Sequence, residues 1–223
     1  MKLEEYFKKP RLQVALDLLD LGKAVEIAKK CVEGGVDIIE VGTPLIKSLG
    51  VKSVEEIRRE FPDEIIFADM KTMDLGALEA KLAFEKGADV VGVAGAAPNT
   101  TIMEAVEEAE KWGRWISADL IGVKDLLNRS IEVAELGVHI VELHVSVDEQ
   151  RRLGLTAIER GELIEEVSSK LTCPLAVAGG INAEKAEKLV LKGAKLIIVG
   201  SSIVKSKNPR LEVEKILRGM GRI

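Results

Sequence analysis

The segment EKGAD, residues 85–89, leads from a stretch with helical periodicity into a short apolar stretch. Three close variants occur elsewhere in the chain: EGGVD at 33–37, ELGVH at 135–139 and LKGAK at 191–195. Each carries a glycine just past the expected end of a helix, where a residue that can adopt positive φ is favoured. These glycines are Gly34, Gly87, Gly137 and Gly193. A joint that recurs in this way indicates a repeated βα unit.

Apolar stretches alternate with amphipathic ones along the whole chain, so the joint belongs to a regular pattern. The expected strands are residues 12–16, 37–41, 65–69, 90–93, 115–119, 140–144, 175–178 and 196–199. The stretches with helical periodicity are residues 23–33, 54–60, 77–86, 101–111, 125–136, 162–171, 183–191 and 209–218. Eight such pairs in a chain of 223 residues fit an α/β fold, the (β/α)8 TIM barrel. We expect residues 1–223 to form one barrel domain.

An open, doubly wound sheet is the alternative architecture, because it also alternates strand and helix. A dinucleotide-binding sheet would carry a G-x-G-x-x-G turn after its first strand. The chain has ALDLLDLGK at residues 15–23 instead. The barrel is therefore favoured.

The composition argues against several classes of protein. Apolar residues make up 47% of the chain, while the net charge of −5 and a pI near 5.4 do not suit a nucleic-acid surface. No apolar run reaches membrane-spanning length, and the start, MKLEEYFKKP, has no hydrophobic signal region. The two cysteines, Cys31 and Cys173, have no metal-ligand spacing and suit a reducing compartment. We expect a soluble, cytoplasmic protein without a nucleic-acid or membrane partner.

Charged side chains gather at the carboxyl ends of the expected strands, where barrel enzymes build their active sites. In IIFADMKTMD, residues 65–74, Asp69 and Lys71 share a face because side chains alternate along a strand, and Asp74 follows in the loop. A single acid at such a position could simply cap a helix, as Asp17 could. Several at corresponding positions indicate a site instead. The set comprises Asp17, Glu40, Asp69, Lys71, Asp74, Asp119 and His144.

The acids of this set outnumber its cations. Asp17, Glu40, Asp69 and Asp74 would face Lys71 alone. Two unit charges about 4 Å apart interact by roughly 4 kcal/mol at an effective dielectric near 20. We therefore expect raised carboxylate pKa values or a bound cation, with Lys71 protonated. Oxygen ligands favour a hard ion, and Mg²⁺ fits best.

The two histidines face opposite ways in a regular strand, because their separation is odd. His139, at the start of its strand, is expected to be structural or exposed. His144, at the active end, is the better proton carrier, since an unperturbed imidazole has a pKa of about 6.5.

The last two strands run into glycine-containing loops, AVAGGIN at 176–182 and IIVGSSIVKS at 197–206. Loops after strands seven and eight commonly bind phosphate in these barrels through backbone N–H groups. The chain therefore predicts a phosphorylated substrate. The residues expected to bind it are Ala178, Gly179, Gly180, Gly200 and Ser201.

The D-x-K-x-x-D motif, Asp69 to Asp74, resembles that of the orotidine 5′-monophosphate decarboxylase suprafamily. Within it, four segments are similar to the 3-hexulose-6-phosphate synthase family: VALDLLD, EVGTPLIKSLG, FADMKTMDLGALEA and AGAAPNTTI. The resemblance implies a lyase that reversibly joins formaldehyde to D-ribulose 5-phosphate, giving D-arabino-3-hexulose 6-phosphate through a 1,2-enediolate.

The resemblance also implies roles for the strand-end residues. Glu40 and Asp69 would ligate Mg²⁺, and Lys71 would hydrogen-bond the enediolate. Asp17 and Asp74 would orient the substrate and Lys71, in a homodimer whose shared active sites receive Asp74 from the partner. His144 would relay the proton, assisted by Asp119. Many members have arginine where this chain has Ser201, so phosphate binding would rest on backbone donors and a nearby lysine.

A near relative, 3-keto-L-gulonate 6-phosphate decarboxylase, is the first alternative. It typically has glutamate, arginine and threonine where this chain has Asp119, Val147 and Ala178, so the synthase is favoured. Orotidine decarboxylase itself is less favoured because it needs no metal and lacks the Glu40 equivalent.

Two further alternatives come from other classes of protein. A pentose-phosphate epimerase would use histidines as ligands of its metal. His139 and His144 are expected on opposite faces of their strand and could not easily share one metal, which argues against an epimerase. A sugar-phosphate-binding sensor would be expected to have lost a motif acid or Lys71, and the chain retains them.

Overall fold

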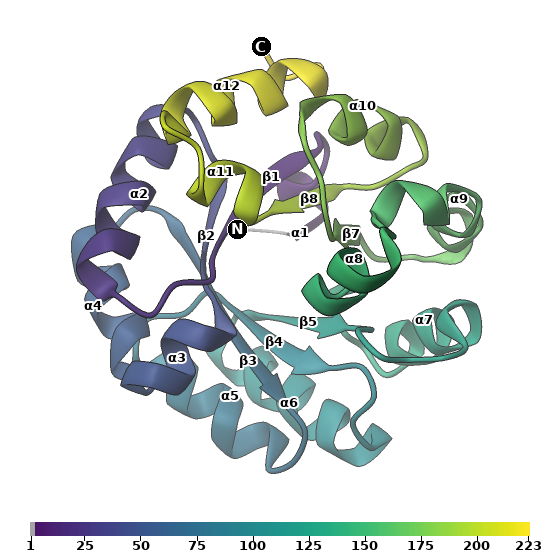
Figure 1. Ribbon diagram of the computed structural model, residues 1–223. Helices are drawn as coiled ribbons and strands as arrows, with labels where there is room; N and C mark the ends of the chain where they lie inside the picture. Colours follow the sequence, from purple (N-terminus) through teal and green to yellow (C-terminus); the bar gives the residue numbers. More distant parts are fainter. Residues whose placement is uncertain (1–2) are drawn as a thin grey trace.

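The computed structural model describes residues 3–223, which form a closed barrel of parallel strands in sequential order, β1 to β8 (Figure 1). The strands are β1 Arg11–Leu16, β2 Ile38–Val41, β3 Ile65–Thr72, β4 Val90–Ala94, β5 Trp115–Asp119, β6 Ile140–His144, β7 Leu175–Ala178 and β8 Leu196–Val199. The predicted (β/α)8 barrel is confirmed. The largest difference is in β3, which continues past the predicted end at Asp69 to Thr72.

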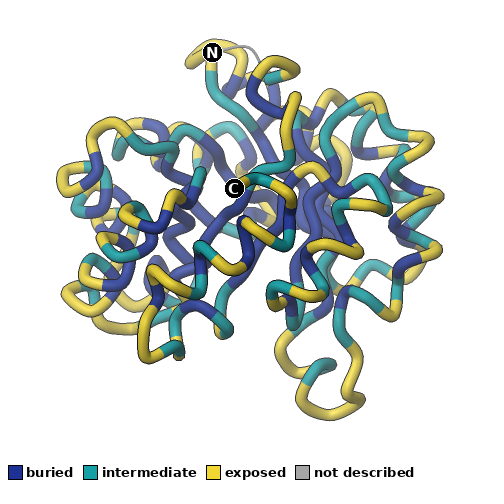
Figure 2. The backbone as a smooth tube through the Cα atoms, turned by 90° about the horizontal axis from the view of Figure 1, so that it is seen from above, coloured by how far each residue is buried: buried dark blue, intermediate teal, exposed yellow. Residues whose placement is uncertain are grey.

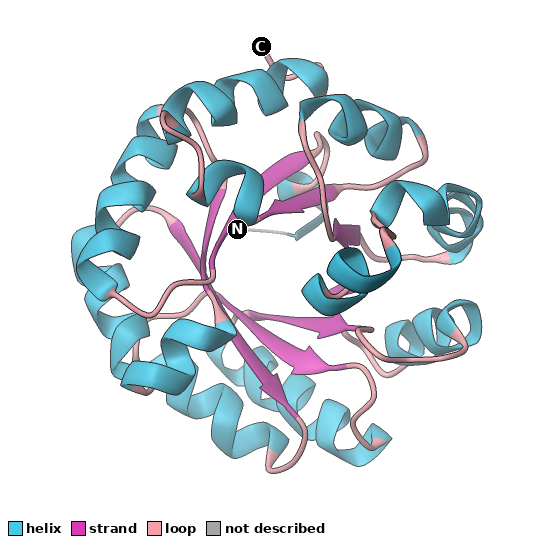
Figure 3. Cartoon of the chain, viewed as in Figure 1, coloured by secondary structure: helices cyan, strands magenta, loops and turns pink. Residues whose placement is uncertain are grey.

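The longer helices surround the barrel on its outside, and short ones lie across its ends (Figure 3). The helices are α1 Leu3–Tyr6, α2 Leu21–Glu33, α3 Thr43–Leu49, α4 Lys52–Glu60, α5 Gly76–Glu85, α6 Asn99–Trp112, α7 Leu126–Glu135, α8 Val147–Leu153, η1 Ala157–Arg160, α9 Gly161–Lys170, α10 Ala183–Leu191, α11 Ser201–Val204 and α12 Pro209–Gly219. The elements that sequence periodicity did not predict are α1, α3, α8, η1 and α11. They have between four and seven residues, which is too short for a helical period to be recognised.

The four repeated joints differ in one detail from the prediction. Gly87, Gly137 and Gly193 have φ of 93°, 92° and 95°, as expected for the residue that ends a helix in the left-handed region. In EGGVD the residue with positive φ is Gly35, at 92°, and Gly34 is right-handed at −81°. The expectation of positive φ at Gly34 was wrong. Gly34 is the cap of the helix, and the left-handed residue is the next one, Gly35.

The last residue of the first three joints ties neighbouring strands together at the amino-terminal end of the barrel. Asp37 Oδ2 accepts a hydrogen bond from Leu12 N at 2.8 Å, and Asp89 Oδ2 accepts one from Ile66 N at 2.9 Å. His139 Nδ1 accepts from Ile116 N at 3.2 Å in the same way. The expected structural role of His139 is therefore confirmed. Burial lowers the pKa of His139, which suits a neutral ring that accepts at Nδ1.

Apolar side chains pack in two groups, one inside the barrel and one between the barrel and its helices. Buried residues lie in the interior of the molecule, and exposed residues lie at its outside (Figure 2). Alternation along each strand produces the division into two groups, since Ile38 and Phe67 point inward while Ile39 and Ile66 pack under the helices. Burying a large aliphatic side chain contributes roughly 1.5–3 kcal/mol. None of the helices within residues 3–223 combines the length and apolar character needed to cross a membrane.

The amino-terminal end of the barrel is closed by α1 and the residue after it. Tyr6 and Phe7 contact each other edge to face with ring centroids 5.1 Å apart, and Tyr6 lies 5.7 Å from the Trp115 ring. These rings belong to the interior apolar group. The polar interior residues described next lie closer to the carboxyl ends of the strands.

Candidate functional site

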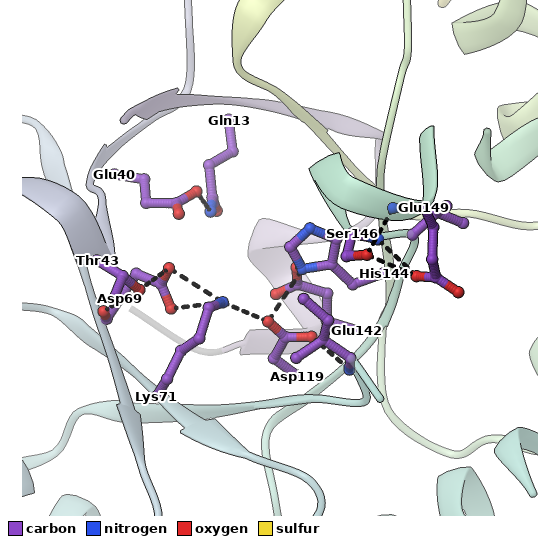
Figure 4. Close-up of polar contacts among 12 residues, drawn as sticks. Gln13, Glu40, Thr43, Asp69, Lys71, Asp119, Glu142, His144, Ser146 and Glu149 are labelled. Carbon is purple, nitrogen blue, oxygen red and sulfur yellow. Dashed lines mark hydrogen bonds and ion pairs between the residues drawn. The ribbon is translucent and has the colours of Figure 1, made fainter. Parts of the chain in front are cut away.

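Lys71 stands at the centre of the polar residues inside the barrel mouth (Figure 4). Its Nζ donates to Asp119 Oδ2 at 2.5 Å and contacts Asp69 Oδ2 at 3.1 Å. Burial alone would lower the pKa of Lys71, but the carboxylates of Asp69 and Asp119 outweigh it and raise the pKa. Lys71 therefore lies among acids, as predicted, in surroundings that favour its protonated form.

The backbone of β3 is irregular where it presents this lysine. The pairing of β3 with β4 shifts register between Ala68 and Thr72, and Lys71 has φ of 48°. A left-handed conformation costs a non-glycine residue roughly 1–2 kcal/mol. Met70 packs against the outer apolar group, as alternation predicted, so the irregular backbone keeps Lys71 directed into the barrel.

Asp119 joins Lys71 to His144. The Nδ1 atom of His144 lies 3.0 Å from Asp119 Oδ2, and Asp119 Oδ1 accepts from Ile121 N at 2.8 Å. Burial would raise the pKa of Asp119, but His144 and Lys71 lower it to about 2. An ionised Asp119 holds a proton on His144 Nδ1, which leaves Nε2 as the nitrogen free to exchange one.

Glu142 lies beneath His144 and was not predicted from the sequence. Its Oε1 atom is 3.4 Å from His144 Nδ1, and its side chain is buried. Burial and the neighbouring Asp119 raise the pKa of Glu142. In VELH, residues 141–144, Glu142 precedes His144 by two positions. The alternation rule that paired Asp69 with Lys71 could therefore have found it.

Glu40 and Asp69 lie on the other side of Lys71 (Figure 4). Gln13 Nε2 donates to Glu40 Oε2 at 2.7 Å, and Thr43 Oγ1 donates to Asp69 Oδ2 at 2.6 Å. Burial raises the pKa of Glu40, with further contributions from Asp69 and Asp17. The sequence predicted raised carboxylate pKa values, and the pKa of Glu40 shifts in that direction, whereas that of Asp119 does not. Gln13 and Thr43 carry no charge, and charge was the signal used to select candidates.

Asp17 follows β1 and stands over this half of the pocket. A Cβ atom at Gly42 would lie 2.4 Å from Asp17 Oδ1, so the glycine makes room for the carboxylate. Desolvation within the pocket and the Asp69 carboxylate raise the pKa of Asp17. It does not cap α2, because Asp20 accepts from Lys23 N in that role.

A metal ion could be held on one side of Lys71 by Asp119, Glu142 and His144, whose ligand atoms lie within 4.8 Å of one another. Both oxygens of Asp119 already accept hydrogen bonds, however, from Ile121 N and from Lys71. On the other side, Gln13 uses Oε2 of Glu40 and leaves Oε1 for another partner. Both groups consist of donors that bind divalent cations.

A cavity of about 950 Å³ opens above these residues. Its inner wall includes Glu40, Asp69, Lys71, Glu142 and His144. The five residues predicted to bind phosphate also line it, namely Ala178, Gly179, Gly180, Gly200 and Ser201. Four lysines lie along the same cavity, Lys23, Lys30, Lys205 and Lys207. Acidic groups thus line the deep end. The outer part is lined by loop backbone and by the lysines, of which Lys30 is paired with Glu26.

The loop after β7 is fixed by close contacts. Gly179 has φ of 119°, and a Cβ atom there would lie 2.7 Å from Val145 O. The Nζ atom of Lys185 donates to Gly180 O at 3.2 Å and to Thr156 Oγ1 at 3.0 Å. Lys185 thereby engages the Gly180 carbonyl oxygen. If it were free, that oxygen would repel an anion bound at the loop.

Two predicted site residues do not line this cavity: Asp119, which is buried behind Lys71 and His144, and Asp74, which lies apart from the cluster. The side chain of Asp74 is exposed, and Oδ1 accepts a hydrogen bond from Leu75 N at 2.8 Å. The loop after β3, α5 and α6 carry exposed apolar side chains, namely Met73, Leu75, Leu78, Leu82 and Met103.

Comparisons with known proteins agree on one family. Residues 10–216 match the family described as Orotidine 5′-phosphate decarboxylase / HUMPS. The chain is 40% identical to the 3-hexulose-6-phosphate synthase of Mycobacterium gastri, over 92% of this chain and 97% of that protein. A crystal structure of 3-hexulose-6-phosphate synthase superposes with a TM-score of 0.88 at 39% identity, over 94% and 99% of the two chains. The structure of 3-keto-L-gulonate-6-phosphate decarboxylase from Vibrio cholerae superposes with a TM-score of 0.83 at 29% identity, over 96% of this chain and 99% of that chain.

Proposed function

The chain belongs to the orotidine 5′-phosphate decarboxylase / HUMPS family, and from this membership we infer that it is a lyase with 3-hexulose-6-phosphate synthase activity. The reaction adds formaldehyde to D-ribulose 5-phosphate and gives D-arabino-3-hexulose 6-phosphate. The observation that carries the inference is the position of Lys71, whose ammonium group contacts Asp69 and Asp119 at the deep end of a cavity with a cationic outer part. The alternatives of an epimerase and a sensor receive no support from the comparisons.

The substrate carries its phosphate at one end and its reacting carbon atoms at the other, and the cavity has the same polarity. The loop glycines Gly179, Gly180 and Gly200 bind the phosphate through backbone N–H groups, and lysines at the outer part replace the arginine that many members have at position 201. The reacting carbonyl group then lies beside Lys71.

The chemical step breaks a C–H bond at C1 of the substrate and forms a C–C bond to formaldehyde. His144 takes the C1 proton at Nε2, because Asp119 fixes the proton on Nδ1. Lys71 donates a hydrogen bond to the oxygen of the resulting enediolate and stabilises its charge. The enediolate carbon adds to formaldehyde, and His144 returns the proton to the new alkoxide. Asp17 orients the substrate hydroxyl groups.

Glu40 and Asp69 are the residues that would hold Mg²⁺, which when bound supplies positive charge to the substrate oxygens. The geometry supports this assignment, because Gln13 engages Oε2 of Glu40 and leaves Oε1 for a cation. Lys71 engages an acid of each group, Asp69 here and Asp119 in the competing group. The free Oε1 atom of Glu40 is therefore what favours this side.

We place a second copy of the chain over the exposed apolar face of α5 and α6, forming a homodimer. This position brings Asp74 to the partner's active site, where it orients the substrate and Lys71. Size measurement by light scattering tests the dimer. Mixing Lys71→Ala with Asp74→Ala subunits tests the shared site, because random pairing leaves about a quarter of the sites intact. Activity that does not rise above that of the separate variants would contradict sharing.

Incubation with ribulose 5-phosphate, formaldehyde and Mg²⁺ tests the activity. Formaldehyde consumption with formation of a hexulose phosphate is expected, and excess EDTA should stop it. Consumption that survives EDTA would contradict the metal assignment. Absence of consumption, with carbon dioxide released from 3-keto-L-gulonate 6-phosphate, would assign the chain to the relative instead.

A further inference from the structure

Gln13 is a fully buried amide inside the barrel, on β1, two residues below the level of Glu40. The register pairs Gln13 with Ile38 and pairs Ala15 with Glu40, so Gln13 approaches Glu40 from the closed side of the barrel. Its Nε2 atom donates to Glu40 Oε2 at 2.7 Å (Figure 4). The interior group at this depth is otherwise largely apolar and includes Phe67 and Ala176.

The amide of Gln13 is only half satisfied. Within residues 3–223, Gln13 Oε1 is a buried atom without a hydrogen-bond partner. A buried polar group left unpaired costs roughly 1–3 kcal/mol, and an apolar side chain of the same shape would avoid the cost. The hydrogen bond to Glu40 is therefore the benefit that a glutamine offers at this position.

The hydrogen bond also decides which oxygen of Glu40 is available. With Oε2 engaged by Gln13, the carboxylate offers Oε1 to a cation. Small Mg²⁺ is usually bound by single carboxylate oxygens, whereas larger Ca²⁺ often takes both oxygens of one carboxylate. Hydrogen bonds to a ligating carboxylate also fix its orientation, and their loss typically lowers metal affinity 10- to 100-fold.

We propose that Gln13 is a specificity-determining residue of the cation site, which makes Glu40 selective for Mg²⁺ over Ca²⁺. The proposal rests on the assignment of Glu40 as a ligand in the proposed function. It assigns to Gln13 a positioning role, exerted through Glu40 without contact with the substrate.

The test measures metal binding directly, without turnover. Mn²⁺ binding to the wild-type protein is followed by electron paramagnetic resonance, and Mg²⁺ and Ca²⁺ are each titrated against it. Gln13→Met keeps the length of the side chain and removes the donor. We expect Mg²⁺ affinity to fall roughly 10-fold, with a smaller loss for Ca²⁺, so that the preference for Mg²⁺ narrows.

Ser117→Ala is the matched control, because Ser117 Oγ is the other buried atom without a partner that the structure shows within residues 3–223. Ser117 lies on β5 inside the barrel, and its replacement should leave both affinities unchanged. If Gln13→Met does not fold, Gln13→Asn serves instead, since its shorter amide cannot reach Glu40.

An unchanged ratio of Mg²⁺ to Ca²⁺ affinity in a folded Gln13 variant would overturn the proposal and leave the proposed function intact. Mn²⁺ binding that is lost in Glu142→Gln but retained in Glu40→Gln would also overturn it, by moving the site to the other side of Lys71. A wild-type protein that consumes formaldehyde yet binds no divalent ion would overturn both this proposal and the metal assignment.

Discussion

The two ends of the barrel treat buried charge in opposite ways. At the amino-terminal end, Asp37 is paired with both Arg11 and Arg222, at 2.7 and 2.9 Å. Asp89 at the same end is paired with Arg58 and Arg114. Each of these acids therefore has two guanidinium partners and also accepts a backbone N–H group of the preceding strand.

At the carboxyl-terminal end, acids outnumber cations. Lys71 contacts Asp69 and Asp119, while burial raises the pKa values of Glu40 and Glu142. The comparison teaches that buried acids serve stability where each has two arginine partners. The same residue types are suited to binding where they outnumber the nearby cations. Four variants test this difference, and they follow from the largest expected effect to the smallest.

Lys71→Met should have the largest effect on activity. It removes the donor to the enediolate and leaves Asp69 and Asp119 without their shared cation, so kcat/KM should fall roughly 10³-fold or more. The measurement is formaldehyde consumption at saturating Mg²⁺, with circular dichroism to confirm the fold. Activity within a factor of ten of the wild type would contradict the role of Lys71.

Asp37→Asn should have the largest effect on stability while leaving activity in place. Breaking a buried ion pair by removing one partner typically costs about 3–5 kcal/mol, because the arginines keep an uncompensated charge. Urea unfolding measures this loss, and kcat at 25 °C on the folded variant is the control. A stable variant with impaired turnover would contradict the division of roles between the two ends.

Glu40→Gln should abolish Mg²⁺ binding and stabilise the metal-free protein at neutral pH by about 1 kcal/mol. The pKa of Glu40 is raised above its ordinary value of 4.5. The unfolded chain therefore ionises first, and stability is lost as pH rises above 4.5. The metal-free wild type should be more stable at pH 5.5 than at pH 7.5. Added Mg²⁺ should restore the stability that is lost at pH 7.5. A wild type and variant with the same pH dependence of unfolding would contradict this origin.

Asp119 should have the opposite pH dependence in the same unfolding series. Its pKa is lowered to about 2, so its contribution is complete above the ordinary value of 3.8 and is lost as pH falls towards 2.

Lys205→Met with Lys207→Met should have the smallest effect. Both side chains line the outer part of the cavity, and exposed charges of this kind contribute up to about 1 kcal/mol each. KM for ribulose 5-phosphate should rise a few-fold with kcat unchanged, and the increase should shrink at high salt. A change in kcat without a change in KM would place these lysines outside the phosphate region.

The barrel itself could be predicted because one joint recurs along the chain. Four of the eight strands, from β5 to β8, have the bounds expected from their apolar stretches. The short helices α3 and α8 escaped prediction because fewer than two full helical turns leave no readable period. The end of β3, beyond Lys71, was also missed, because a register shift between strands cannot be seen in an apolar pattern.

The candidate site could be predicted where charge marked it. Asp69, Lys71, Asp119 and His144 meet as alternation and strand position predicted. Gln13 was missed because a neutral amide in a strand looks like an ordinary core position until its neighbour on the next strand is known. The place of Asp74 depends on a second chain and stays a prediction.

The left-handed backbone at Lys71 limits how this pocket can be rebuilt for other chemistry. β-Branched residues are the least tolerant of that conformation, so valine, isoleucine or threonine at position 71 would disturb the end of β3 as well as remove the ammonium group. Glycine, asparagine and aspartate are the substitutions that the main chain itself accepts. Design of a new activity on this scaffold is therefore best begun from these three residues, with the replacement cation introduced from a neighbouring strand.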